Sequence, residues 1–217
     1  MSLHHHPDIS TLISYAAGSL PEALATVVAC HLSVCGQCQQ QVSEAEQIGS
    51  LLLNDIEPVP VSDKAKDALL QKLDQLDNIQ TLTIKKTSQP IGESPALLQK
   101  LLKSKQLDQL NWKSMAPGMK QYIISHSDDR LRLLKIAPGT CMPVHGHTGS
   151  ELTMVLRGSY TDETGHYSSG DIADLGSDIQ HQPVVDSHQE CICLIATDAP
   201  LRFVNWVPRL LQPFFGI

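Results

Sequence analysis

The chain has 217 residues, enough for two modest domains, and its 16 basic and 23 acidic residues give a formal net charge of −7. No apolar run approaches the roughly 20 residues that span a bilayer, and the N-terminus has no basic segment followed by an apolar one, so we expect a cytoplasmic protein without a membrane span. Six cysteines are too few for a disulfide scaffold, and four of them form two close pairs, which indicates metal or redox chemistry.

The negative charge is concentrated at the start of the chain. Residues 1–63 contain no Lys or Arg, and their acidic residues are Asp8, Glu22, Glu44, Glu46, Asp55, Glu57 and Asp63. An acidic surface of this kind argues against direct nucleic-acid binding and suits a basic protein partner. The alternative is a solvated acidic face that has no partner.

The first third of the chain is predicted to form short helices. Asp8 or Ser10 can cap a first helix that stops at Gly18. Residues 19–22 have the S-x-x-E form of a capping box with a proline in the first turn, which predicts a second helix as far as Val34.

Two further helices are expected before a polar linker. Residues 39–53 have apolar residues at helical period, and a fourth helix begins at the Ser62 cap. The apolar stripe of this fourth helix, which includes Leu69 and Leu73, can pack either in the chain's own core or on a partner. We predict a helical domain over residues 1–84, a linker over 85–95 and a second domain over 96–217.

The end of the second helix carries metal-ligand spacing. His31 and Cys35 are four residues apart, so they share a helical face, and Cys38 turns back towards them. This H-x3-C-x2-C pattern supplies three ligands of a tetrahedral zinc site, and a structural site needs a fourth. The spacing alone leaves three candidates, His4, His5 and His6. The alternatives for the two cysteines are a dithiol redox pair or small core residues.

In the second half of the chain, apolar and polar residues alternate in short runs that are interrupted by glycines and prolines. After a helical pattern over residues 95–109, this texture predicts a mainly β sandwich or barrel. The predicted strands are residues 121–125, 131–136, 151–156, 159–162, 165–168, 171–174, 182–185, 191–197 and 201–203.

A second metal-ligand pattern, G-x5-H-x-H-x3-E-x6-G, spans residues 139–158. His145 and His147 project from the same face of an extended strand, and Glu151 can fold back towards them after a short bend. Two imidazoles and a carboxylate suit a divalent transition metal. A third imidazole, from His181 on an antiparallel neighbour, would complete the set.

Cys191 and Cys193 lie two residues apart on a predicted strand, and hence on one face. This placement is poor for an unstrained disulfide. The two thiols are therefore either small apolar residues inside the barrel or a redox-sensitive pair beside the metal.

Residues 139–158 resemble the first cupin motif, and residues 170–181 resemble a looser second motif. The N-terminal H-x3-C-x2-C resembles a zinc-binding anti-sigma domain. In this order, and over nearly the whole chain, the combination is similar to the ChrR type of anti-sigma factor.

That resemblance implies a fold, a partner and a set of ligands. It implies a zinc-pinned domain of three to four helices, followed by a cupin barrel, in a protein that is not an enzyme. The helical domain would hold an extracytoplasmic-function (ECF) sigma factor, and the cupin would release it in response to singlet oxygen or related oxidants. Zinc would be bound by His6, His31, Cys35 and Cys38, and again by His145, His147, Glu151 and His181. The rival hypothesis is a metal-dependent cupin dioxygenase or isomerase.

Overall fold

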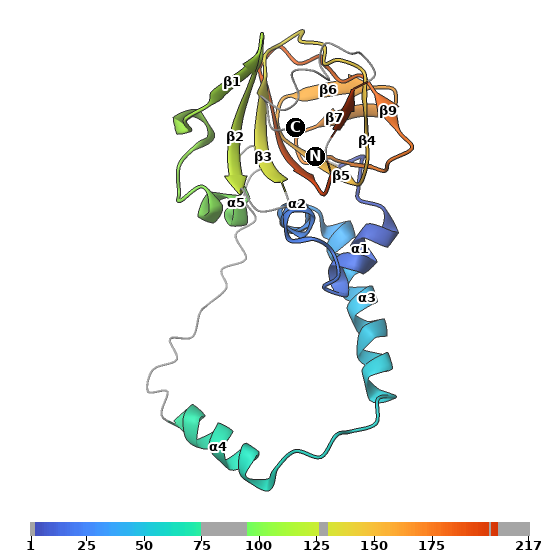
Figure 1. Cartoon of the computed structure of the whole chain (residues 1–217), viewed down its shortest axis with the longest axis vertical. Helices are drawn as coiled ribbons and strands as arrows, with labels where there is room; N and C mark the ends of the chain where they lie inside the picture. The colour runs from blue at the N-terminus through green and yellow to red at the C-terminus, as the bar shows by residue number, and fades with distance from the viewer. Residues whose placement is uncertain (1–2, 75–94, 126–129, 200, 204–217) are drawn as a thin grey trace.

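A computed structural model describes residues 3–74, 95–125, 130–199 and 201–203. Helices near the N-terminus are followed by a cupin-like β-sandwich, which confirms the expected fold class (Figure 1). The helices are α1 (Ile9–Ala16), α2 (Glu22–Leu32), α3 (Gly36–Asn54), α4 (Asp63–Asp74) and α5 (Ala96–Leu101), with a 3-10 turn η1 (Leu107–Gln109). None of these helices is long and apolar enough to cross a membrane.

Two helix predictions were wrong in detail. The capping box at residues 19–22 does not form: α2 follows Pro21 with no side-chain cap, and the Ser19 hydroxyl donates to the Ser14 carbonyl. The single helix expected over 95–109 is divided, because Lys103 and Ser104 have positive φ values of 53° and 61° that a right-handed helix cannot contain.

The β part contains a large sheet and two small ones. The six-stranded sheet has the order β1-β2-β3-β11-β5-β8, and the three-stranded sheets are β10-β6-β7 and β12-β4-β9. The strands of the large sheet are β1 (Lys113–Ala116), β2 (Met119–Ser125), β3 (Arg130–Ile136), β5 (Glu151–Arg157), β8 (Ile172–Leu175) and β11 (Cys191–Thr197). Those of the small sheets are β4 (His145–His147), β6 (Ser159–Asp162), β7 (Gly165–Ser168), β9 (Gln180–His181), β10 (Val184–Val185) and β12 (Leu201–Phe203).

Several strand predictions are confirmed at their bounds, namely 159–162, 165–168, 191–197 and 201–203. Of the strand expected over 182–185 only Val184 and Val185 form one, as β10, and the separate strand β9 ends at His181 before Pro183. Proline has no N–H to donate to a ladder, which explains the interruption. Strand β1 has no counterpart among the predictions.

Helix α2 joins the helical part to the sandwich. It packs against β3, β5 and β11, and its buried side chains share one core cluster with residues of the large sheet. Leu24, Val27 and Val28 contribute from the helix, and Leu133 and Leu194 from the sheet. The two parts therefore have a continuous core. The expected linker, 85–95, lies outside the described residues except for Pro95.

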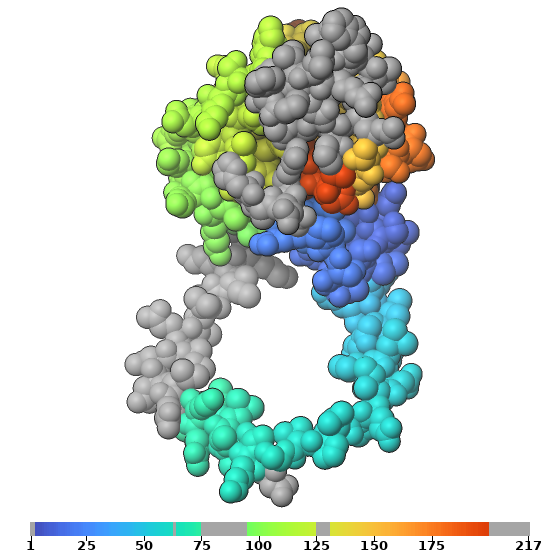
Figure 2. All heavy atoms as spheres, viewed as in Figure 1, coloured from blue at the N-terminus to red at the C-terminus, as the bar shows by residue number. Residues whose placement is uncertain are grey.

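The C-terminal half of α3 and all of α4 project away from this body as an arm (Figures 1 and 2). Leu69 and Leu73 on α4 are 59% and 49% exposed, so the stripe does not pack in the chain's own core. Ile48, Leu51 and Leu52 on α3 are also exposed. The arm thus presents apolar side chains to its surroundings.

Candidate metal centres

The N-terminal cluster brings together His6, His31, Cys35 and Cys38, each offering one ligand atom within 4.8 Å of the others. His31 lies in the last turn of α2, Cys35 is the N-cap of α3, and Cys38 lies in the first turn of α3. Helix α3 begins three residues earlier than predicted, and the Cys38 N–H donates to the Cys35 sulfur at 3.5 Å. The chain segment before α1 supplies His6.

The distances in this cluster fit a tetrahedral ion. Nδ1 of His6 lies 3.4 Å from the sulfurs of both Cys35 and Cys38. Zn–S and Zn–N bonds of ordinary length at a tetrahedral angle would place such nitrogen and sulfur atoms about 3.6 Å apart. In addition, Nδ1 of His31 donates to the Gly170 carbonyl at 3.0 Å, which leaves Nε2 of this ring buried without a hydrogen-bond partner. A buried polar atom of this kind calls for a ligand.

The pKa values of two of these groups agree with a metal site. Burial lowers the pKa of His31 to about 4, so the imidazole is neutral at pH 7, as a ligand must be. Burial and the neighbouring Cys35 raise the pKa of the Cys38 thiol to about 12, so its thiolate needs a cation beside it. Four protein ligands would leave no open position, which is typical of a structural zinc site.

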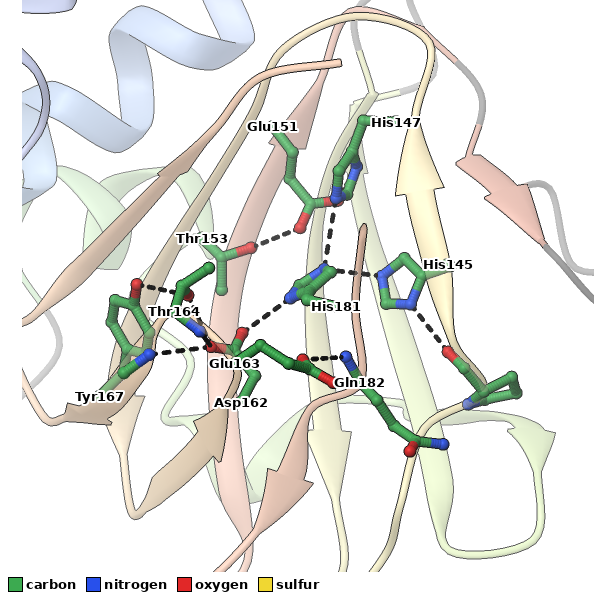
Figure 3. Close-up of polar contacts among 12 residues, drawn as sticks. His145, His147, Glu151, Thr153, Asp162, Glu163, Thr164, Tyr167, His181 and Gln182 are labelled. Atoms are coloured by element: carbon green, nitrogen blue, oxygen red, sulfur yellow. Dashed lines mark hydrogen bonds and ion pairs between the residues drawn. The ribbon is translucent and has the colours of Figure 1, made fainter. Parts of the chain in front are cut away.

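The second cluster lies in the sandwich and consists of His145, His147 and His181 (Figure 3). Strand β4 carries the first two, and β9 pairs with it in antiparallel register, so that His181 lies opposite His145. Nε2 of His181 is 3.1 Å from Nε2 of His145 and 3.3 Å from Nε2 of His147. Tetrahedral zinc ligands would be about 3.3 Å apart, so the three imidazoles are spaced for one ion.

Hydrogen bonds orient two of these rings. Nδ1 of His145 donates to the Pro143 carbonyl at 2.9 Å, and Nδ1 of His181 donates to the Asp162 carboxylate at 2.7 Å. Both Nε2 atoms are therefore directed to the centre in the form that binds metal. Burial lowers the pKa of His147 to about 4 and lowers that of His145 as well, which favours neutral rings.

Glu151 lies beside the three imidazoles and outside the group that they form. One of its oxygens is 3.4 Å from Nδ1 of His147, and the other accepts a hydrogen bond from the Thr153 hydroxyl at 3.0 Å. The carboxylate thus contacts the cluster through the His147 ring, and its predicted role as a direct ligand stays a prediction.

A largely apolar pocket opens next to the three imidazoles. Its polar lining residues include His145, Glu151, His181 and Arg132, and Cys193 also lines it. The sulfur of Cys193 is 3.6 Å from that of Cys191, and both thiols are buried and free. The hydrogen bond to Cys191 and burial raise the pKa of the Cys193 thiol well above its usual value, which disfavours a reactive thiolate.

Sequence reasoning missed the residues that support the ligands from behind. Asp162 and the Gly170 carbonyl each contact a ligand histidine from another part of the chain, at sequence separations of 19 and 139. Periodicity within one element carries no signal for such contacts. Asp171, next to Gly170, supports the His4–His6 segment in a similar way.

The comparisons with known proteins identify the family of the chain. Residues 103–200 match the family described as the ChrR cupin-like domain. The anti-sigma-E factor ChrR of Cereibacter sphaeroides is 37% identical over 218 residues, covering 100% of each chain. The crystal structure of Rhodobacter sphaeroides SigE in complex with the anti-sigma ChrR also matches, with a TM-score of 0.76 and 34% identity, covering 91% of this chain and 100% of that chain. This chain belongs to the ChrR family of anti-sigma factors.

Proposed function

We propose that this chain sequesters an ECF sigma factor through its N-terminal helices and releases it when the cupin part senses an oxidant. The family relationship supports the anti-sigma role, since the relative is named an anti-sigma-E factor and the matching solved structure is a complex with SigE. The role is regulatory and not enzymatic, which argues against the rival dioxygenase or isomerase. Sigma factors act on RNA polymerase, and this supports a cytoplasmic location.

The observation that carries the proposal is the uncovered apolar arm. Ile48, Leu51 and Leu52 on α3 are 61%, 68% and 63% exposed, although solvent-exposed helix faces are normally polar. The first basic residue of the chain is Lys64, so this face of α3 lies within an acidic segment. A sigma factor offers basic surface for nucleic acid and polymerase, and the charge of the acidic segment complements it, while the exposed apolar side chains of the arm would be covered by the partner.

We propose zinc as the ion at the N-terminal cluster, where it would fix the base of α3 against α2. A cluster of two histidines and two cysteines favours zinc over harder cations. For the sandwich cluster we propose zinc with His145, His147, His181 and Glu151 as ligands, although three imidazoles and a carboxylate also suit other divalent transition metals. A bound metal there would supply a Lewis-acidic centre next to the pocket.

The pocket supports the sensing role. Two of the three imidazoles, His145 and His181, line the pocket together with Cys193, so a small oxidant inside it would contact both kinds of side chain. We propose singlet oxygen or a related oxidant as the signal, with Cys191 and Cys193 as candidate redox partners. We also propose the functional division 1–84, 85–95 and 96–217, with the shared core making the two larger parts dependent on each other.

The test is co-expression of the full chain with the ECF sigma factors of its own organism, followed by co-purification. Leu52→Glu on the arm should weaken the complex by about 30-fold or more, as expected for the loss of a central apolar contact. Leu97→Glu is the matched control, because Leu97 is 37% exposed on α5, away from the arm. No complex with any of these sigma factors, or equal losses for both variants, would contradict the proposal.

A further inference from the structure

The segment that carries His6 is held by the sandwich. The backbone N–H groups of His4 and His5 donate to one oxygen of Asp171 at 2.8 and 3.1 Å, and the Asp171 side chain is buried. Its other oxygen accepts hydrogen bonds from the Ser168 N–H and hydroxyl, both at 2.9 Å. The carboxylate therefore fastens the His4–His6 segment to the turn between β7 and β8.

The same turn also holds a second ligand of the N-terminal cluster. Its Gly170 carbonyl accepts the hydrogen bond from Nδ1 of His31. The turn approaches the N-terminal segment so closely that a Cβ atom on Gly170 would lie 2.5 Å from the Leu3 side chain. Two of the four candidate zinc ligands, His6 and His31, are thus positioned by residues 168–171.

At the other cluster, Asp162 joins His181 to the β6–β7 turn (Figure 3). Its side chain is fully buried. One oxygen accepts from His181, and the other accepts from the Thr164 N–H at 2.8 Å, the Thr164 hydroxyl at 2.6 Å and the Gly165 N–H at 3.2 Å. A carboxylate with this many donors has one orientation, so a movement of His181 has to move the turn as well.

Tyr167 contacts both the β6–β7 turn and the N-terminal segment, and so connects the two. The only proton of the Thr164 hydroxyl is donated to Asp162, so the 2.9 Å contact between Thr164 and Tyr167 has the Tyr167 O–H as donor. The Tyr167 ring packs on the His5 ring in a tilted arrangement with 4.2 Å between centroids, and it stacks on Tyr160, a lining residue of the pocket, with 5.0 Å between centroids.

We infer that the β6–β7 hairpin and the turn after it couple the two metal clusters, with Asp162 and Tyr167 as positioning residues that pass a displacement of His181 to the segment bearing His6. This coupling rests on the proposed function, because it assumes that each of the two clusters binds a metal ion. Loss of either positioning residue loosens the N-terminal ion, although both residues lie in the sandwich. With the link intact, occupation of the sandwich cluster strengthens binding of the N-terminal ion and so slows its release, and at equilibrium each ion strengthens binding of the other by the same factor.

Cobalt(II) in the full-length protein provides a probe that separates the two sites. Only the N-terminal cluster includes cysteines, so a thiolate-to-cobalt charge-transfer band reports on that cluster alone. The measurement is the rate at which this band disappears after a chelator is added. Asp162→Asn should raise the rate by about 5-fold or more. Tyr167→Phe should raise it by a smaller factor, because the ring still packs on His5.

Asp186→Asn is the matched control. This carboxylate accepts hydrogen bonds from the Ser159 and Thr161 hydroxyls of the same hairpin and contacts neither cluster, so the release rate should not change. Tyr167→Phe is nearly isosteric and decides the question if Asp162→Asn does not fold. If folded Asp162→Asn and Tyr167→Phe show a normal cobalt band and release the ion at the wild-type rate, the coupling is overturned, while the N-terminal metal site stands. Equal acceleration by Asp186→Asn also overturns it, and the absence of a band in the wild type overturns the N-terminal metal site itself.

Discussion

Replacing Gly170 with alanine should loosen the junction between the N-terminal segment and the sandwich. Gly170 has φ +97°, a conformation that costs an L-residue about 1–2 kcal/mol. The new methyl group would lie 2.5 Å from a terminal methyl group of Leu3, so the end of this side chain, which packs against the core, has to shift. Leu3 is only partly buried, so its displacement should cost about 1 kcal/mol more. The free energy of unfolding should fall by about 2–3 kcal/mol.

For a chain of this size, that loss corresponds to a decrease in Tm of about 5–10 °C, measured by thermal unfolding of the metal-loaded protein. Gly49→Ala is the control, because Gly49 lies inside α3, where an added methyl group meets no atom within 4 Å. The same substitution at this position should not destabilise the protein, and it should raise the free energy of unfolding by up to about 1 kcal/mol. An unchanged Tm for Gly170→Ala would refute the close packing of Leu3 on this turn.

Two further predictions concern the metals. Cys38→Ser should remove the N-terminal ion and sigma-factor binding together, while the sandwich ion remains. The metal content of the purified protein should therefore fall from two ions to one per chain. A variant that retains two ions would contradict the assignment of Cys38 as a ligand. Acidification should release the N-terminal ion first. The pKa of the Cys38 thiol is about 12, so a proton competes with the metal for this sulfur throughout pH 8 to 6, and the apparent affinity of the N-terminal site for metal should fall at least about tenfold per pH unit. His147, with a pKa of about 4, stays neutral in that range, and chelator competition at both sites should show the difference.

The sequence predicted the parts of the metal centres that depend on local geometry. His31, Cys35 and Cys38 lie within eight residues across the junction of α2 and α3, and His145 and His147 are neighbours on one face of a strand. Strand periodicity is enough to bring the two strand histidines together. The helical face expected to join His31 and Cys35 does not form, because α2 ends at Leu32 and Cys35 is the extended N-cap of α3, so the turn between the two helices brings these ligands together. The fourth N-terminal candidate was beyond this reasoning, because three successive histidines in an irregular segment have no period.

Long-range contacts distinguish those three histidines in the structure. The His4 and His5 backbones are bound to Asp171 and the His5 ring packs on Tyr167, whereas the His6 ring lies at the sulfurs of the cluster. The sequence also predicted a helical domain with its own boundary, but in the structure its helix α2 shares a core with the sandwich. The apolar face of α2 gives no indication of which surface covers it, and the structure places it against the large sheet.

Helix α3 explains how a small change at the N-terminal cluster can affect a partner on the arm. Its first turn carries Cys38, and its C-terminal half carries the exposed Ile48 and Leu52. With 19 residues the helix is about 28 Å long, so a tilt of about 10° at its base moves its far end by about 5 Å. A displacement of that size exceeds what a packed apolar interface tolerates. On the proposed function, loosening the cluster at the base of α3 would therefore weaken sigma-factor binding along the arm without any unfolding of the sandwich.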